Sequence, residues 1–201
     1  MSQLKLTADG GGGTVSLKGP SSTTGNAAIE LTVPGTGNAT LLTSATSTGK
    51  ILQVVSTAKT DAFTTSSQSL VDITGLSATI TPSATSSKIL VLYNVQIASN
   101  GFPALVLLRD STNIYKGDAS SNRYQAAFGG YLGEHSSGNT TTAAGQFLDS
   151  PSTTSATTYK LQTGHIHATG YTIYINRSRG DTNFNYIFRT PSSITLMEVA
   201  A

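Results

Sequence analysis

The residues best suited to chemistry are the three histidines, His135, His165 and His167, and the last two lie in a GHIHA stretch at 164–168. On a β-strand, alternate side chains point to the same face, so His165 and His167 would stand about 7 Å apart. Two imidazoles from one chain hold a metal ion poorly, but three chains around a threefold axis would present six nitrogens to a first-row metal. The sequence therefore predicts either a metal ion on a trimer axis or two ordinary surface histidines.

Hydrolytic chemistry has little support in this sequence. A nucleophilic serine needs a histidine and a carboxylate to activate it, and no GxSxG motif accompanies the histidines. Paired carboxylates could cleave a glycoside, but their separation in space cannot be read from a sequence. The carboxylates considered are Asp110, Asp118, Glu134, Asp149 and Asp181. We expect no enzymatic activity and no cofactor other than the metal ion described above.

Four consecutive glycines, Gly10 to Gly13, invite comparison with a phosphate-binding loop. Such a loop needs a helix after it, whose N-terminus faces the anion. The residues that follow, TVSLKG at 14–19, alternate as in a strand instead. The pattern predicts a hairpin that joins Leu4 to Thr7 with Thr14 to Lys18, and a compliant glycine loop that becomes ordered when it docks.

The first part of the chain is poor in apolar residues, which recur at period two in three short sets. Burying each aliphatic side chain contributes about 1.5 to 3 kcal/mol, whereas ordering each residue costs about 1 to 2 kcal/mol. We therefore expect residues 1–49 to be a Gly-rich β segment that needs neighbours, for trimerisation and for docking to a partner. The residues assigned to this role are Leu4, Leu6, Gly10, Gly11, Gly12, Gly13, Val15, Leu17, Ile29, Leu31 and Val33.

The composition narrows the fold class and the partners. Charged residues make up only 11% of the chain, and Ser, Thr, Asn and Gly are abundant, which favours strands and turns over helices. The net charge of +2 comes without any basic run, so we expect no nucleic-acid binding. No cysteine is present to form a disulfide or a thiolate metal site. Because no long apolar run occurs, we expect neither a secretory signal nor insertion into a membrane.

From residue 50 onward, apolar density rises and turn clusters separate strand-length segments. In KILVLYNVQIA at 88–98, one face carries Ile89, Val91, Tyr93, Val95 and Ile97, while the other starts apolar and turns polar halfway. Residues 50–201 are therefore predicted to form an antiparallel β-sandwich, with a jelly roll as the leading topology. The strands expected lie within 50–55, 77–80, 88–98, 104–110, 123–132, 143–148, 159–168, 171–176 and 192–199.

The last predicted strand, SSITLMEV at 192–199, is apolar on both faces. Ile194 and Leu196 share one face, and Met197 and Val199 share the other. Two explanations stay open: a central position in the sheet, or an interface between copies of the chain.

Aromatic residues gather in the second half of the chain with arginines between them. Such residues suit a ligand-contacting surface, and they equally suit the core and rim of a sandwich. The residues are Tyr115, Tyr124, Phe128, Tyr131, Tyr159, Tyr171, Tyr174, Phe184, Tyr186 and Phe188, with Arg109, Arg123, Arg177, Arg179 and Arg189.

Longer stretches carry a family resemblance. LKLTADGGGGTVSLKGPSSTTGNAAIELTVPGTG at 4–37 resembles the N-terminal segment of virion proteins from marine and cyanobacterial tailed phages, of the tail-fibre and head-decoration type. Later stretches are similar to the β-rich C-terminal module of the same group: GKILQVVSTAKTDAF at 49–63, LVDITGLSATITPSATSSKILVL at 70–92, LDSPSTTSATTYKLQ at 148–162, YINRS at 174–178 and RTPSSITLMEV at 189–199. The motifs are structural and bring no catalytic residues.

The resemblance implies a homotrimer that is made in the host bacterial cytoplasm and becomes part of the virion. Two non-enzymatic functions then compete. The protein is either a fibre or knob, docked to the particle through residues 1–49, whose sandwich meets a host cell-surface glycan or protein, or a capsid decoration protein that stabilises the head. Its other partner would be a capsid or tail protein of the same particle.

Overall fold

The computed structural model describes residues 4–7, 14–17, 50–133, 137–167 and 169–201. These residues form strands, turns and loops, and none of them lies in a helix, so the expectation of an all-β protein is confirmed. The chain divides into two units, Met1–Thr43 and Ser44–Ala201. This division falls shortly before the predicted boundary between residues 49 and 50.

The first unit contains the predicted hairpin pairing. Strand β1 (Leu4–Thr7) pairs antiparallel with β2 (Thr14–Leu17), with Leu4 opposite Leu17 and Leu6 opposite Val15. The glycines Gly10 to Gly13 and the predicted strand around Ile29, Leu31 and Val33 lie outside the described residues.

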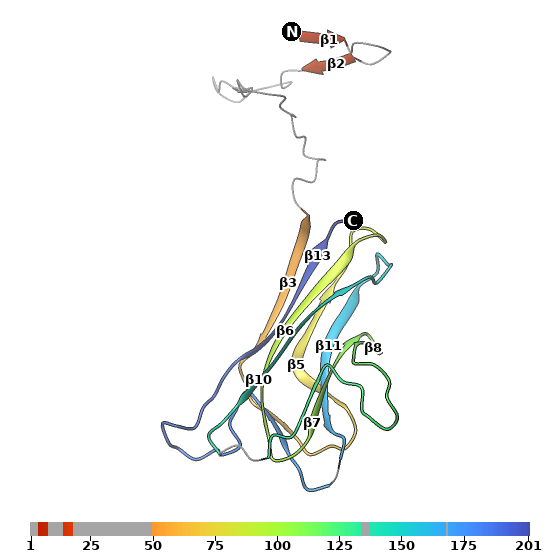
Figure 1. Ribbon diagram of the computed structural model, residues 1–201. Helices are drawn as coiled ribbons and strands as arrows, with labels where there is room; N and C mark the ends of the chain where they lie inside the picture. The colour runs from red at the N-terminus through yellow and green to blue at the C-terminus, as the bar shows by residue number, and fades with distance from the viewer. Residues whose placement is uncertain (1–3, 8–13, 18–49, 134–136, 168) are drawn as a thin grey trace, which may run out of the picture. The chain divides into compact units, whose positions relative to one another are not determined.

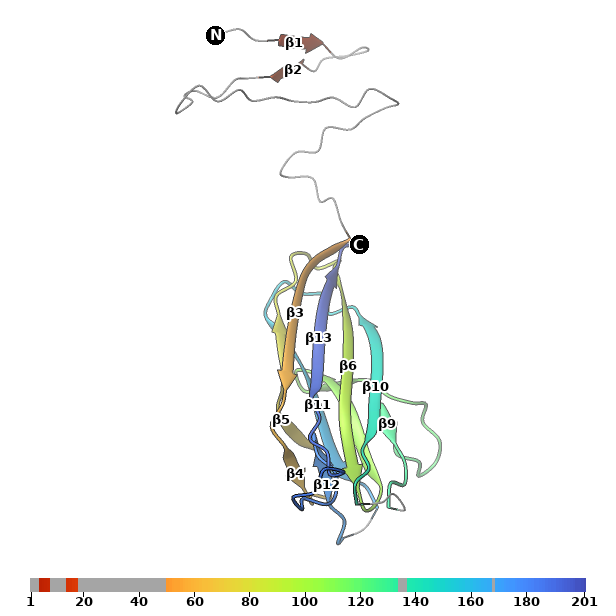
Figure 2. The same cartoon turned by 90° about the vertical axis from the view of Figure 1, so that its left-hand side faces the viewer.

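The second unit is built from two antiparallel sheets, shown from two sides in Figure 1 and Figure 2. In the larger, six-stranded sheet, β6 pairs with β10 along one edge. Along its other edge, β6 pairs first with β13 and, near its C-terminal end, with β12. Strands β3 and β4 pair in turn with β13 and β12. The bounds are β3 Ile51–Lys59, β4 Phe63–Thr65, β6 Lys88–Ser99, β10 Thr141–Asp149, β12 Ile173–Ile175 and β13 Ser192–Val199.

The smaller, five-stranded sheet has the order β5–β11–β7–β8, and β9 pairs with β7 as well. Its strands are β5 Val71–Ile80, β7 Pro103–Arg109, β8 Thr112–Tyr115, β9 Phe128–Gly129 and β11 Thr157–His165.

One hydrophobic core lies between the two sheets. Alternate residues of β6 are buried, from Ile89 to Ile97, so the predicted core face of this strand is confirmed. From the opposite sheet, Leu107, Tyr159 and Leu161 join the same cluster. Strand β13 contributes Ile194 and Leu196, both fully buried, while its other face is only half-buried.

Three sequence predictions need correction. The strand predicted for 123–132 is mostly a loop, in which only Phe128–Gly129 pairs with β7, because Gly129 and Gly130 interrupt the alternation. The strand predicted for 159–168 stops at His165, because its neighbour β7 begins at Pro103, which has no N–H to extend the ladder. The strand expected at 77–80 is the end of the longer β5, and β4 and β8 are additional strands.

Candidate interaction surface

Three of the carboxylates considered for catalysis take structural roles, and a fourth, Asp118, is exposed. The side chain of Asp149 is buried. Its two carboxylate oxygens accept hydrogen bonds from Nη1 of Arg109 at 2.9 and 3.0 Å, and one of them accepts a hydrogen bond from the hydroxyl of Tyr159 at 2.6 Å. Asp110 accepts the backbone N–H of Thr158, and Asp181 pairs with two arginines. Within the described ranges, no three His, Cys, Asp or Glu residues come together as a metal-binding group. Glu134 lies outside those ranges.

His165 and His167 do not share a strand face. The strand ends at His165, which is 1% exposed, whereas His167 follows it in a bend and is exposed. The imidazole of His165 packs against Tyr171 with ring centroids 5.6 Å apart, and that of His167 packs against Phe102 at 4.9 Å. The assumed geometry for a shared metal is thus wrong within one chain, and a metal on a trimer axis stays a prediction.

The buried His165 favours its neutral form. Desolvation lowers the pKa of His165 below its usual value, and backbone groups of Phe102 and Thr172 oppose part of this effect. Neither ring nitrogen makes a hydrogen bond of good geometry to the described residues. His165 therefore acts as a packed ring under the loops at this end of the sheets.

The outer face of the larger sheet extends across the paired strands β3, β13, β6 and β10. It turns from polar to apolar along its length, as the register of β3, β13, β6 and β10 shows. Ser193 lies between Ala58 and Asn94, and Asn94 faces Ala144. Further along, Thr195 lies between Ser56 and Leu92, which faces Gln146.

The apolar end of this face consists of four side chains in register, which we call the aliphatic row: Val54, Met197, Leu90 and Leu148. Val54 is 56% exposed and Leu148 is 47% exposed, and Leu52 beside them is 39% exposed. Aliphatic side chains that adjoin one another across four strands form a patch rather than scattered surface residues, and such patches mark interaction sites.

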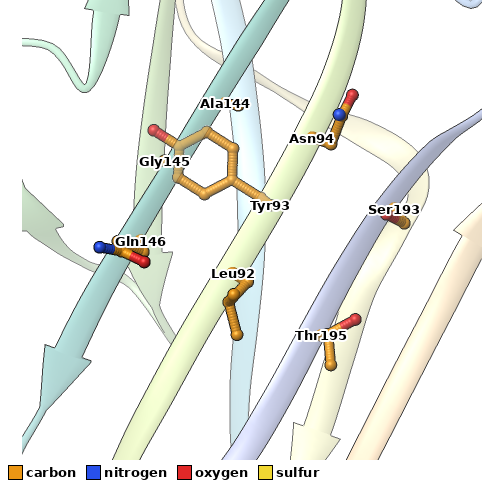
Figure 3. A pocket seen from close by; sticks show the side chains of 8 residues that line it. All are labelled: Leu92, Tyr93, Asn94, Ala144, Gly145, Gln146, Ser193 and Thr195. Atoms are coloured by element: carbon orange, nitrogen blue, oxygen red, sulfur yellow. The ribbon is translucent and has the colours of Figure 1, made fainter.

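The polar part of the same face is hollowed by two shallow grooves. One, of about 430 Å³, is lined by side chains that include Leu92, Asn94, Gln146 and Thr195 (Figure 3). The other adjoins it through Asn94 and Ser193 and continues to Gln96 and Pro191. The residues that line both grooves are neutral, so contact here would rest on amide and hydroxyl hydrogen bonds.

A buried aromatic ring, that of Tyr93, forms part of the floor of the first groove. Tyr93 is 4% exposed, and its ring fills the space above Gly145 on β10, as Figure 3 shows. Its hydroxyl has no hydrogen-bond partner among the described residues. Burial and, to a smaller extent, Tyr115 raise the pKa of Tyr93 to about 12, so the hydroxyl stays protonated and does not act as a base.

The other residues singled out from the sequence fall into separate groups. Leu4, Leu6, Val15 and Leu17 lie in the hairpin of the first unit. Of the aromatic residues, Tyr159 is a core residue, and five are exposed: Tyr124, Tyr131, Phe184, Tyr186 and Phe188. The outer face could be anticipated only in part, from the apolar residues on the second face of β6 and β13.

No protein-family model matches the chain, and no curated protein matches it significantly. No described segment forms a helix capable of crossing a membrane.

Proposed function

We propose that this protein is a non-enzymatic virion structural protein of a tailed phage, assembled as a homotrimer. The aliphatic row is the observation that carries the proposal, because it leaves apolar side chains exposed or partly exposed on four adjacent strands. Copies of the chain arranged around an axis would remove these side chains from water, at about 25 cal/mol for each Å² of apolar surface buried.

In this proposal the second unit is a jelly-roll-like β-sandwich head. Its two antiparallel sheets and shared core support that topology. Residues 1–49 dock the trimer to another virion protein, and this segment contains the paired strands β1 and β2. The head is then a compact knob that faces the host cell surface.

Absence of catalysis is part of the same proposal. Of the carboxylates considered, Asp110, Asp149 and Asp181 are occupied by hydrogen bonds or ion pairs within the chain, and Asp118 is exposed. The grooves on the outer face are lined by neutral residues and so offer no general acid or base.

The alternative role, a capsid decoration protein, would use the same trimer with the aliphatic row or the hairpin on the capsid. The two roles differ in copy number. Quantitative mass spectrometry of purified particles would give a few trimers for tail attachment and many tens for the capsid. Absence of the protein from the particles would contradict both roles.

The trimer is tested on the purified full chain. Sedimentation equilibrium should give three times the chain mass of 20.7 kDa. Leu148→Asp and Val54→Asp should shift the protein toward monomer, because each places a charge in the buried interface. Tyr124→Asp, at an exposed aromatic residue outside the aliphatic row, is the matched control and should remain trimeric. A wild-type monomer, or equal dissociation of all three variants, would overturn this assembly.

A further inference from the structure

Exposed aromatic rings gather at the end of the second unit opposite the aliphatic row. Phe184, Tyr186 and Phe188 are 55%, 56% and 53% exposed, and all three lie in the loop between β12 and β13. Tyr131, 49% exposed, belongs to a neighbouring loop at the same end. Strands β3 and β13 begin at opposite ends of the second unit (Figure 1). The large exposed side chains are aliphatic where β3 begins and mainly aromatic where β13 begins.

The loop that carries three of these rings is fixed by hydrogen bonds. The buried hydroxyl of Ser178 donates to the carbonyl of Gly138 at 2.7 Å and accepts the N–H of Phe188 at 3.1 Å. The N–H of Ser178 donates to the carbonyl of Phe188, and that of Gly180 donates to the carbonyl of Ser137. A loop held in this way presents its rings with little ordering cost on binding.

The rings stand among planar polar side chains. Phe184 and Tyr186 are stacked, with centroids 5.1 Å apart and planes 8° from parallel. Asp181 pairs with Arg177 at 3.1 Å and with Arg189. Asn183 and Asn185, which alternate with the rings along the chain, are exposed and make no hydrogen bond to other described residues.

We propose that this loop, residues 181–189, binds the pyranose rings of a glycan. The C–H groups on one face of a pyranose carry slight positive charge and pack on the negative face of an aromatic ring, while amides and carboxylates hydrogen-bond to neighbouring hydroxyl groups. Exposed aromatic faces beside the exposed Asn183 and Asn185 match this chemistry. The choice of a cell-surface glycan as its source rests on the proposed attachment role.

Two other ligand classes fit less well. A phosphate-rich ligand would need unpaired cations, but Arg177 and Arg189 both pair with Asp181. A protein partner would ordinarily bury about 800 Å² of surface on each side around an apolar centre, whereas this loop alternates aromatic and polar residues.

The test measures binding of the full chain to immobilised dextran, mannan and alginate, so that neutral and carboxylated sugars are separated. Wild-type protein should bind at least one of them. Phe184→Ala and Tyr186→Ala should each weaken that binding about tenfold, because each removes a stacking surface. Tyr124→Ala, which removes a ring of similar exposure (48%) elsewhere, should leave it unchanged.

Thermal unfolding of each variant should match wild type, since the rings are already half-exposed. Lack of binding to all three glycans, or binding that survives the loss of both rings, would overturn the inference. Sedimentation of the same samples reports the trimer independently, so failure of glycan binding is distinguishable from failure of assembly.

Discussion

The ring of Tyr93 occupies the space that any side chain at position 145 would need. A Cβ atom added to Gly145 would lie 2.4 Å from the hydroxyl oxygen and 2.6 Å from Cζ of Tyr93, far inside normal contact. Because Tyr93 is buried in the common core, its ring cannot swing out to relieve the contact. The glycine on β10 and the tyrosine on β6 therefore depend on each other.

We expect Gly145→Ala to lower the free energy of unfolding by about 1 to 3 kcal/mol through overpacking. Tyr93→Phe should have a small or stabilising effect, because the hydroxyl that it removes has no partner among the described residues. Chemical denaturation measures both. Gly130→Ala is the control, since a Cβ there meets nothing within 4 Å. Equal losses at positions 130 and 145 would argue against the contact.

Glu198 should make the second unit sensitive to acid. Its carboxylate is fully buried and accepts hydrogen bonds from Gln53 at 2.6 Å and from the backbone and hydroxyl of Ser83 at 2.7 and 2.6 Å. Desolvation favours a higher pKa, but the hydrogen bonds from Ser83, Ser87 and Gln53 outweigh it and lower the pKa of Glu198 to about 2. The ionised form therefore stabilises the fold by about 3 kcal/mol above pH 5.

Because the folded pKa lies below the unfolded one, this stabilisation is lost as the pH falls from about 4.5 toward 2. Glu198→Gln should be less stable than wild type at pH 7 and should approach it in stability near pH 2. Urea denaturation at both pH values measures the difference. Asp118→Asn, at an exposed position, is the control and should track wild type throughout. A constant gap between Glu198→Gln and wild type would contradict the prediction.

His165 should add a second pH dependence at milder acidity. Since desolvation lowers the pKa of His165 in the folded state, the unfolded chain takes up the proton first. Stability should therefore fall as the pH drops below about 6.5, until the folded pKa is passed. Melting temperatures between pH 7.5 and 5 should show this fall in wild type and much less of it in His165→Phe. His167→Gln, which removes an exposed imidazole, should behave like wild type.

Deletion of residues 1–37 should leave a folded second unit that no longer joins the particle. The described core consists of residues from Ser44–Ala201, so its packing does not need the deleted segment. Circular dichroism and thermal melting test the fold, and incorporation into particles during infection tests the docking. Normal incorporation of the shortened protein would contradict the docking role of the N-terminal segment.

The alternation of buried and exposed residues along single strands could be predicted from the sequence, because burial on a strand follows a period of two residues. It identified the core face of β6, from Ile89 to Ile97, and the bounds of β13 at Ser192–Val199. It also showed that Met197 and Val199 make the second face of β13 apolar, and β13 proved to be a central strand between β3 and β6.

Relationships between distant segments could not be read in the same way. The aliphatic row exists only because the register sets Met197 beside Leu90 and Leu90 beside Leu148. His165 is buried because residues from other loops, Phe102 and Tyr171 among them, cover the end of β11. No local sequence pattern predicts either the register that forms the aliphatic row or the burial of His165. The Phe184–Tyr186 stack likewise depends on a loop conformation fixed through Ser178, which contacts a different loop at Gly138.

The continuous run of β6 has a mechanical consequence. This strand reaches from the aliphatic end of the second unit to the aromatic end, and it is paired with β10 along nine residues and with β13 along seven. A pulling force applied between the two ends would run along these strands and load their hydrogen bonds in shear. Bonds loaded in shear must break together, whereas peeling breaks them one at a time, so the second unit should transmit tension between its ends without unravelling.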